Sequence, residues 1–522
     1  MEGQRMAKRL DMERAFRQYV EEIGSAIGHV DRKTPLREYM TGLMLPLERK
    51  SVEPMAAALE PRRTGTAHQR THHFVAKSGW NDEDLLKAVR KWAIPRLTIK
   101  DIVKAWIIDD TGFPKKGKHS VGVARQYCGQ LGKQDNCQVA VSLSIATERA
   151  SLPIGYRLYL PKEWAEDTEK RAQAEIPDAI VFRTKPEIAL DLLEKAIEQE
   201  IPRAIVLADA GYGNDTEFRE KLNALKVVYA VGVHKNATVW TAGTAPSQPP
   251  AYQGKGRPRK RLMRDKDHMP LSVASLATSL PRKAWKDITW REGVAGEMTS
   301  RFARLRVHAA HRDEKRSELR QEEWLVIEWP SGEAEPAKYW LSTMESDVKF
   351  TEMVHTIKMR WMIERDYQEL KQEIGLGHFE GRGWNGFHHH ASLCIAAYAF
   401  LVCARFSFFP SGAARIFFKA PAIPKGFRPR GSASQRTACS VVPDDNPPPS
   451  HHSPFGTFIP LSLLPPGIQE ISDTHERLWH SSTSKVVRYF TSFTPSLYPS
   501  HSIVSIIPSA VGYAKTGALN MG

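Results

Sequence analysis

The amino-acid sequence predicts an α/β fold built on a mixed sheet, and three observations support this prediction. Short apolar runs at residues 104–110, 120–129 and 136–146 show the alternation and turn punctuation of neighbouring strands. The segment 185–201 is an amphipathic helix with Pro186 in its first turn, and an apolar strand follows it. Strands first, and then helices that alternate with strands, favour a mixed sheet with flanking helices.

Length, charge and cysteine content narrow the class of protein. The chain has 522 residues and a net charge of +15, with a pI near 9.4. Such a balance favours a polyanionic partner, DNA or RNA, over an acidic small molecule. The 5 cysteines show no CxxC spacing, so neither a disulfide framework nor a zinc site is indicated, and we expect a cytoplasmic protein. The first residues do not resemble a secretory signal, and we expect no membrane partner.

The order of patterns along the chain predicts five regions. Residues 1–100 are expected to be helical and are a candidate DNA-end-binding module, with a structural cap on the next domain as the alternative. Residues 101–234 and 346–408 are expected to form the two parts of the core, separated by a β-rich insertion at 235–345. Residues 409–522 are rich in proline and poor in acidic residues, so we expect a disordered tail or out-of-frame sequence there.

Local signals predict two helix starts and one buried helix. Asn81 or Asp82 is the expected N-cap of the helix that follows, and Asn214 with Glu217 has the spacing of a capping box. The apolar run 391–409 is nearly long enough to span a membrane, but it contains an arginine and follows a helical segment. We therefore predict a buried helix for this run.

Aspartates at the ends of two apolar strands are candidate site residues. Asp110 ends the run AWIIDD, and Asp209 directly follows IVLA. Ligands of α/β sheets gather beyond the carboxyl ends of strands, where a side chain is exposed yet rigidly placed. Asp109 precedes Asp110 and should face the other side of the strand, so only one of the pair can point into a shared site. A turn-forming aspartate is the alternative at each position.

A third carboxylate comes from a helix predicted over residues 349–374. Arg360, Glu364 and Lys371 fall on one stripe of this helix, because a rotation of about 100° per residue puts them at about 0°, 40° and 20°. A solvated face with ordinary ion pairs is the alternative. Three carboxylates from two strands and a helix offer the hard oxygen ligands that suit Mg²⁺ or Mn²⁺. Such metals activate water and stabilise the leaving oxygen of a phosphodiester.

The chain also contains, in order, three blocks that resemble those of DDE transposases from bacterial insertion sequences, in particular the group with a Tyr-Arg-Glu-Lys signature. The blocks are DDTGFPKKGKHSVGVARQYCGQLGKQDNCQVAVSL, VLADAGYGNDTEF and RWMIERDYQELKQEIGLGHFEGRGWNGFHHH. The resemblance covers roughly residues 30–405. It implies an RNase H-like catalytic core, with a β-rich insertion between the second Asp and the Glu.

The resemblance also implies an activity and its residues. By motif position, Asp110, Asp209 and Glu364 would hold Mg²⁺ or Mn²⁺, and Arg360 and Lys371 would contact DNA phosphates. The implied reaction is metal-dependent cleavage and strand transfer of double-stranded DNA at terminal inverted repeats. The implied partners are the element ends, the target DNA and a second copy of the chain in a dimeric active complex. A catalytically inactive DNA-end-binding inhibitor of transposition is the alternative.

Four further features qualify these expectations. The segment GFPKKGKH almost fits a phosphate-binding P-loop, but His119 stands where Ser or Thr must bind Mg²⁺, so an NTPase is not favoured. The basic motif at 255–261 resembles the core of an AT-hook, and a solvated loop is equally compatible. The histidines at 388–390 are expected in a structural or DNA-facing loop, not in a zinc site. Ile357 occupies the position of the signature Tyr.

Overall fold

The structure, a computed structural model, describes residues 2–408 apart from residues 250, 255–256, 258–259, 267, 294–295 and 314–315. Contacts divide the chain into residues 1–467 and residues 468–522, and every described residue belongs to the first unit. The tail predicted for residues 409–522 lies outside the described residues. Part of the basic motif at 255–261 lies outside them as well.

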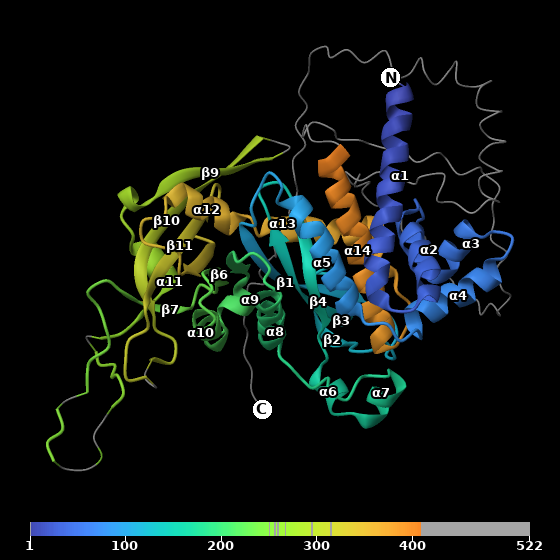
Figure 1. Cartoon of the computed structure of the whole chain (residues 1–522). Helices are drawn as coiled ribbons and strands as arrows, with labels where there is room; N and C mark the ends of the chain where they lie inside the picture. Colours follow the sequence, from blue (N-terminus) through green and yellow to red (C-terminus); the bar gives the residue numbers. More distant parts are fainter. Residues whose placement is uncertain are drawn as a thin grey trace, which may run out of the picture. The chain divides into compact units, whose positions relative to one another are not determined.

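Five strands form the centre of the protein and confirm the predicted mixed sheet (Figure 1). An antiparallel meander comes first, and two parallel strands then join β1, which gives the spatial order β4-β3-β1-β5-β6. The bounds are Ala105–Pro114 for β1, Lys133–Ala146 for β3, Ser151–Leu158 for β4, Ile205–Ala208 for β5 and Tyr229–Val233 for β6. The arrangement is consistent with the RNase H-like fold that the sequence resemblance implied.

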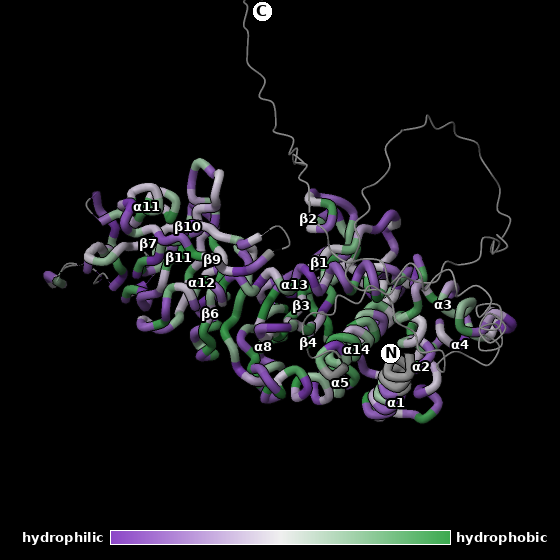
Figure 2. The backbone as a smooth tube through the Cα atoms, turned by 90° about the horizontal axis from the view of Figure 1, so that it is seen from above, coloured by the Kyte–Doolittle hydropathy of each residue, from purple (hydrophilic) through white to green (hydrophobic). Residues whose placement is uncertain are grey.

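The central strands are buried because their apolar runs are covered on both faces. Trp106, Ile107 and Ile108 of β1 have no exposed surface, and all four residues of β5 are buried. Hydropathy drawn along the backbone shows apolar stretches in the strands near β3 and β4 (Figure 2). This continuous burial is typical of strands that pack between layers of helices. The polar positions of β1 begin at Asp109, just beyond the parallel pairing with β5. The strand continues to Pro114, so the prediction that Asp110 stands at a strand end is wrong.

Helices connect the strands, and their first residues carry recognisable caps. The bounds are Lys162–Ala165 for α6, Thr168–Gln173 for α7, Lys185–Glu198 for α8, Ala210–Gly213 for α9 and Thr216–Ala224 for α10. Helix α8 begins with a capping box of Thr184 and Glu187. The N-cap of α10 is Asp215, so the predicted cap at Asn214 is wrong by one residue. Asn214 instead donates its side-chain N–H to the carbonyl of Ala210.

The N-terminal residues are helical, as expected, and pack around the last described helix, α14. The bounds are Glu2–Gly24 for α1, Lys33–Met44 for α2, Val52–Leu59 for α3, Thr64–Ala76 for α4, Asp82–Leu97 for α5 and Trp384–Phe408 for α14. Asn81 caps α5, as predicted. In the described part of the chain, one segment, Trp384–Phe406, is long and apolar enough to cross a membrane. However, 94% of its apolar window is buried inside the protein, which confirms the predicted buried helix.

The histidine triplet lies within α14, so the prediction of a loop there is wrong. The Nε2 atom of His388 accepts a hydrogen bond from the backbone N–H of Leu158, at 3.2 Å. His389 stacks on Trp80 with ring centroids 3.7 Å apart. His390 is also buried, and burial lowers its pKa to about 4. The three rings therefore join α14 to surrounding backbone and aromatic groups as neutral core residues.

The region between β6 and the last helices is β-rich and continues the central sheet. Strand β12 pairs with β6, and β11, β10 and β7 follow outward. The bounds are Thr238–Thr241 for β7, Leu271–Ser272 for β8, Val273–Ser279 for α11, Lys286–Gly293 for β9, Gly296–Ala309 for β10, Glu322–Pro330 for β11 and Lys338–Ser342 for β12. The insertion is therefore hydrogen-bonded to the central sheet, because β12 pairs with β6, and β6 lies next to β5.

The helix predicted over 349–374 is divided into three segments. Helix α12 covers Phe350–Lys358, α13 covers Trp361–Glu369, and a π-helical turn covers Leu370–Ile374. Contacts on either side of the division differ, since Lys358 forms a buried ion pair with Glu328 of β11 whereas Arg360 contacts β1. The two anchors orient α12 and α13 separately, which a continuous sequence pattern does not reveal.

Candidate active site

The parallel pairing of β1 with β5 brings two aspartates together just beyond its last pair. Ile107 pairs with Leu207 in the parallel register. Two residues further along the chain stand Asp109, within β1, and Asp209, directly after β5, so these residues lie close together where the parallel pairing ends. Asp209 also caps helix α9, because its Oδ1 accepts the backbone N–H of Gly211 at 2.9 Å. This hydrogen bond fixes the direction of the Asp209 side chain.

Close packing behind Asp209 explains the glycines that follow it. A Cβ atom on Gly213 would lie 1.9 Å from the carbonyl oxygen of Gly232 on β6. A Cβ atom on Gly232 would lie 2.9 Å from the backbone nitrogen of Ala210. Only glycine lets these backbones approach so closely. The turn after β5 is thereby pressed against β6, and Asp209 is held at the rim of the sheet.

The two neighbouring aspartates of β1 face different partners. Asp109 accepts a hydrogen bond at 3.0 Å from Nη1 of Arg360, which stands at the start of α13. Asp110 forms an ion pair with Lys185 in the first turn of α8. Successive side chains of a strand point to opposite faces, which accounts for the divergence. The structure thus places Asp109, and not the sequence-predicted Asp110, beside Arg360.

Arg360 is the common neighbour of three carboxylates. Its Nη2 lies 3.7 Å from Oε1 of Glu364, whose side chain is 67% exposed. Burial lowers the pKa of Arg360, but the charges of Asp109, Asp209 and Glu364 outweigh it and raise the pKa above its ordinary value. The predicted residues Asp209 and Glu364 therefore share one electrostatic environment with Arg360.

The carboxylates suit a hard divalent cation by their chemistry. Burial raises the pKa of Asp109 to about 7, the charge of Arg360 opposes this rise, and the carboxylates of Asp209 and Asp110 add to it. A second positive charge would therefore stabilise the ionised acids, and oxygen ligands are those that Mg²⁺ and Mn²⁺ prefer. Within the described ranges, no three His, Cys, Asp or Glu side chains are oriented to hold a metal as they stand. Arg360 lies among the carboxylates instead.

Lys371, the other predicted phosphate contact, forms hydrogen bonds within the protein. Its Nζ donates to the carbonyl of Gly112 on β1 at 2.7 Å and approaches Oε1 of Gln130 at 3.3 Å. Burial lowers the pKa of Lys371 to about 8. Arg360 and Lys371 therefore contact the same strand three residues apart, at Asp109 and Gly112. Two members of the predicted stripe thus contact β1 despite the division of the helix, whereas the third, Glu364, is exposed beside Arg360.

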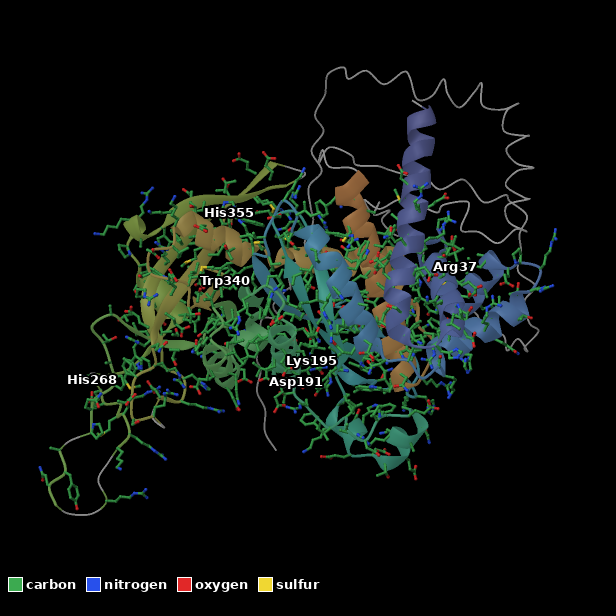
Figure 3. The ribbon with its side chains drawn as sticks, viewed as in Figure 1. Arg37, Asp191, Lys195, His268, Trp340 and His355 are labelled. Carbon is green, nitrogen blue, oxygen red and sulfur yellow. The ribbon has the colours of Figure 1, made fainter. Side chains whose placement is uncertain are left out.

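A cavity of about 950 Å³ lies against the acidic residues and extends to the insertion. Asp209, Arg360 and Glu364 form part of its wall. Aromatic residues from the insertion and from α13 form another part, among them Trp340 of β12, which is labelled in Figure 3, and Trp361. The arrangement offers accessible carboxylates, cations and flat apolar surfaces in one concave region.

A mixed sheet with aspartates close together on adjacent parallel strands, and with a glutamate on a later helix, is consistent with the class of nucleic-acid-cleaving proteins that have an RNase H-like core. Residues 22–297 match the sequence model of the family described as DDE superfamily endonuclease, and the chain belongs to this family. Nucleases of this superfamily generally use divalent metals.

One relative from Microchaete diplosiphon is described as "Probable transposase for insertion sequence element IS701". It is 34% identical to this chain over 169 residues, which are 32% of this chain and 41% of that protein. The chain therefore matches less than half of the relative's length. The family match ends before Glu364. The assignment of Glu364 to the site therefore rests on the structure and on the sequence motif.

Proposed function

We propose that the chain is the transposase of an insertion sequence, which binds the terminal inverted repeats of its element and catalyses DNA cleavage and strand transfer. The observation that carries the proposal is the position of Arg360 among Asp109, Asp209 and Glu364. Membership of the DDE superfamily endonucleases and the similarity to a transposase support it. We also propose that the protein works in the cytoplasm, because its 5 cysteines show no disulfide spacing and fit a reducing compartment.

Asp109, Asp209 and Glu364 are the residues proposed to hold Mg²⁺ or Mn²⁺. The bound ion supplies Lewis acidity and an activated water for phosphodiester chemistry. Arg360 places a positive charge among the three carboxylates before DNA arrives, and its guanidinium is then available to a phosphate. Lys371 supports β1 at Gly112, which keeps the end of the strand in place.

Nicking of the element's own terminal repeat in Mg²⁺ or Mn²⁺ tests the proposal. We expect Asp109→Asn, Asp209→Asn and Glu364→Gln to lose nicking while DNA binding persists in a mobility-shift assay. Asp110→Asn is expected to keep most of the activity, because Asp110 pairs with Lys185. Loss in Asp110→Asn together with activity in Asp109→Asn would return the ligand role to Asp110, as the motif position implied.

The same assay separates the enzyme from an inhibitor. A wild-type chain that binds the repeat but never nicks it in either metal is an inactive DNA-end-binding protein. A wild-type chain that binds no duplex at all contradicts both functions. We further propose a dimer in the active complex, because two element ends must be joined. Light scattering of the complex with the repeat measures that stoichiometry.

A further inference from the structure

The segment that follows the catalytic strand β1 is strongly basic. Residues 115–134 contain five lysines and arginines and no acidic residue. The side chain of Lys115 forms a hydrogen bond within the protein, since its Nζ donates to the carbonyl of Phe379 at 2.8 Å. Lys116, Lys118 and Arg125 are exposed. Lys133 is also exposed, but it pairs with Asp135 at 3.2 Å.

One asparagine brings the exposed cations together. Asn136 of β3 pairs with Arg125 in the register of β2, which covers Ala124–Cys128. The side-chain N–H₂ of Asn136 also donates to the carbonyls of Lys115, at 2.6 Å, and Gly117, at 2.9 Å. The turn that carries Lys116 and Lys118 is therefore fastened beside Arg125. These three cations are part of one surface although up to nine residues separate them in sequence.

The β2–β3 hairpin bends toward the end of β1 and reaches the catalytic segment. A Cβ atom on Gly112 would lie 2.9 Å from Sγ of Cys128, so the glycine makes room for the hairpin. Gln130, at the tip, lies 3.3 Å from Nζ of Lys371. Lys371 also contacts β1 only three residues beyond Asp109. The hairpin is thereby held next to the carboxylates.

The same hairpin exposes large apolar side chains. Tyr127 is 59% exposed and Leu131 is 42% exposed. Tyr127 lies two residues from Arg125 on β2, so the two side chains share one face of the strand. An exposed aromatic ring beside cations is the combination by which proteins hold unpaired nucleotides, since the cations bind phosphates and the ring stacks on a base.

We propose that Lys116, Lys118, Arg125 and Tyr127 form a DNA-binding surface, called here the hairpin surface. The three cations bind backbone phosphates of the DNA next to the scissile bond, and Tyr127 stacks on an unpaired base of that DNA. This inference rests on the proposed function and adds to it the surface that receives the DNA beyond the carboxylates. The ligand of the hairpin surface is therefore DNA that offers both a polyanionic backbone and a flat, unpaired base.

Fluorescence anisotropy of a labelled duplex oligonucleotide across a salt series, in EDTA, tests the cations. The triple variant Lys116→Ala, Lys118→Ala, Arg125→Ala is expected to reduce the slope of log affinity against log salt by about 3, roughly one for each lost phosphate contact. The matched control is Lys221→Ala with Lys226→Ala, two exposed lysines of the α10 region, and it should leave the slope unchanged. Melting curves verify that both variants fold.

A duplex with a single-stranded extension tests the aromatic residue. Tyr127→Ala is expected to weaken binding of this probe about tenfold, within the range for loss of one stacked base, and to leave a blunt duplex unaffected. Tyr127→Phe should retain binding, because the ring remains. An unchanged salt slope in the triple variant, or equal binding of both probes by Tyr127→Ala, overturns the hairpin surface. If the wild type fails to bind either probe, the proposed function itself fails.

Discussion

The two sides of the segment 360–369 carry carboxylates in opposite environments. On one side Glu364 is 67% exposed and lies near Arg360, beside the cavity. On the other side Asp366 has no exposed surface and Glu369 is only 2% exposed. The hydroxyl of Tyr398 lies 2.9 Å from the first of these buried acids and 2.8 Å from the second. One short helix thus presents the same chemical group to solvent and to the core.

This difference shows that the role of each acid in the segment depends on its exposure and not on its residue type. Burial raises the pKa of Asp366 to about 6 and that of Glu369 to about 7. One hydroxyl proton cannot serve two carboxylates fully, so a proton held on one acid completes the buried cluster. The negative charge on the exposed side is instead balanced by the guanidinium of Arg360, whose place beside the carboxylates a metal cation can take. We expect the buried side to control stability and the exposed side to control activity.

The largest expected effect is on catalysis. Glu364→Gln should reduce nicking at least about 100-fold, because even groups that only orient metal ligands cost 10–100-fold when lost. Its melting midpoint should equal that of the wild type, since the side chain is mostly exposed. Nicking rates and thermal melting measure the two quantities. A variant that melts earlier and still nicks would reverse the roles of the two sides.

The next effect is on the pH dependence of stability. The folded pKa of Glu369 is raised, so the folded state holds a proton that the unfolded chain releases at lower pH. Its contribution is complete at acidic pH and is lost as the pH rises through about 7. Glu369→Gln should remove on the order of 2 kcal/mol of the decline in unfolding free energy between pH 5 and pH 8. Urea titrations at both pH values measure this, and a decline as steep as in the wild type contradicts it.

A smaller loss is expected from the shared hydroxyl. Tyr398→Phe leaves Asp366 and Glu369 with one donor fewer and should cost about 1–3 kcal/mol of unfolding free energy. The control is Tyr212→Phe, because the hydroxyl of Tyr212 is buried with no hydrogen-bond partner among the described residues. Urea unfolding compares them. Equal losses in both variants would show that the hydroxyl contact contributes nothing specific.

The smallest expected effect concerns the guanidinium on the exposed side. Arg360→Gln removes a positive charge next to Asp109 and Glu364, so Mn²⁺ should bind the DNA-free protein about tenfold more tightly. Arg365→Gln is the matched control, because Arg365 pairs with Glu369 on the buried side. Titration followed by electron paramagnetic resonance of Mn²⁺ measures the affinity. Equal affinities for both variants would mean that Arg360 does not compete with the metal.

Much of the fold was predictable because its elements are defined by local patterns. The apolar run before Asp209, the amphipathic segment that became α8 and the Asn81 cap all depend on residues a few positions apart. Strand β4, Ser151–Leu158, was not predicted, since its burial on both faces hides the alternation that marks a strand. The histidine triplet was assigned to a loop because the glycines before it resemble a helix end, while α14 begins at Trp384.

The candidate site was only partly predictable. The motif implied Asp110, whereas the structure sets Asp109 beside Arg360. A local signal for this was present, since Asp109 and Asp209 are each the first polar residue after a short apolar run of the sequence. The partners Lys185 and Gln130 had no such signal, because 75 residues separate Lys185 from Asp110 and 241 separate Gln130 from Lys371.

The sequence by itself determined the mixed sheet, the basic charge and the acidic residues that follow two apolar runs, because spacing and composition act over short distances. The tertiary structure decided which aspartate of β1 meets Arg360, which carboxylates of α13 are buried and where the β2–β3 hairpin lies. These outcomes depend on the register between β1 and β5 and on the separate anchoring of α12 and α13. Contacts between residues far apart in the chain set both, and no local pattern encodes them.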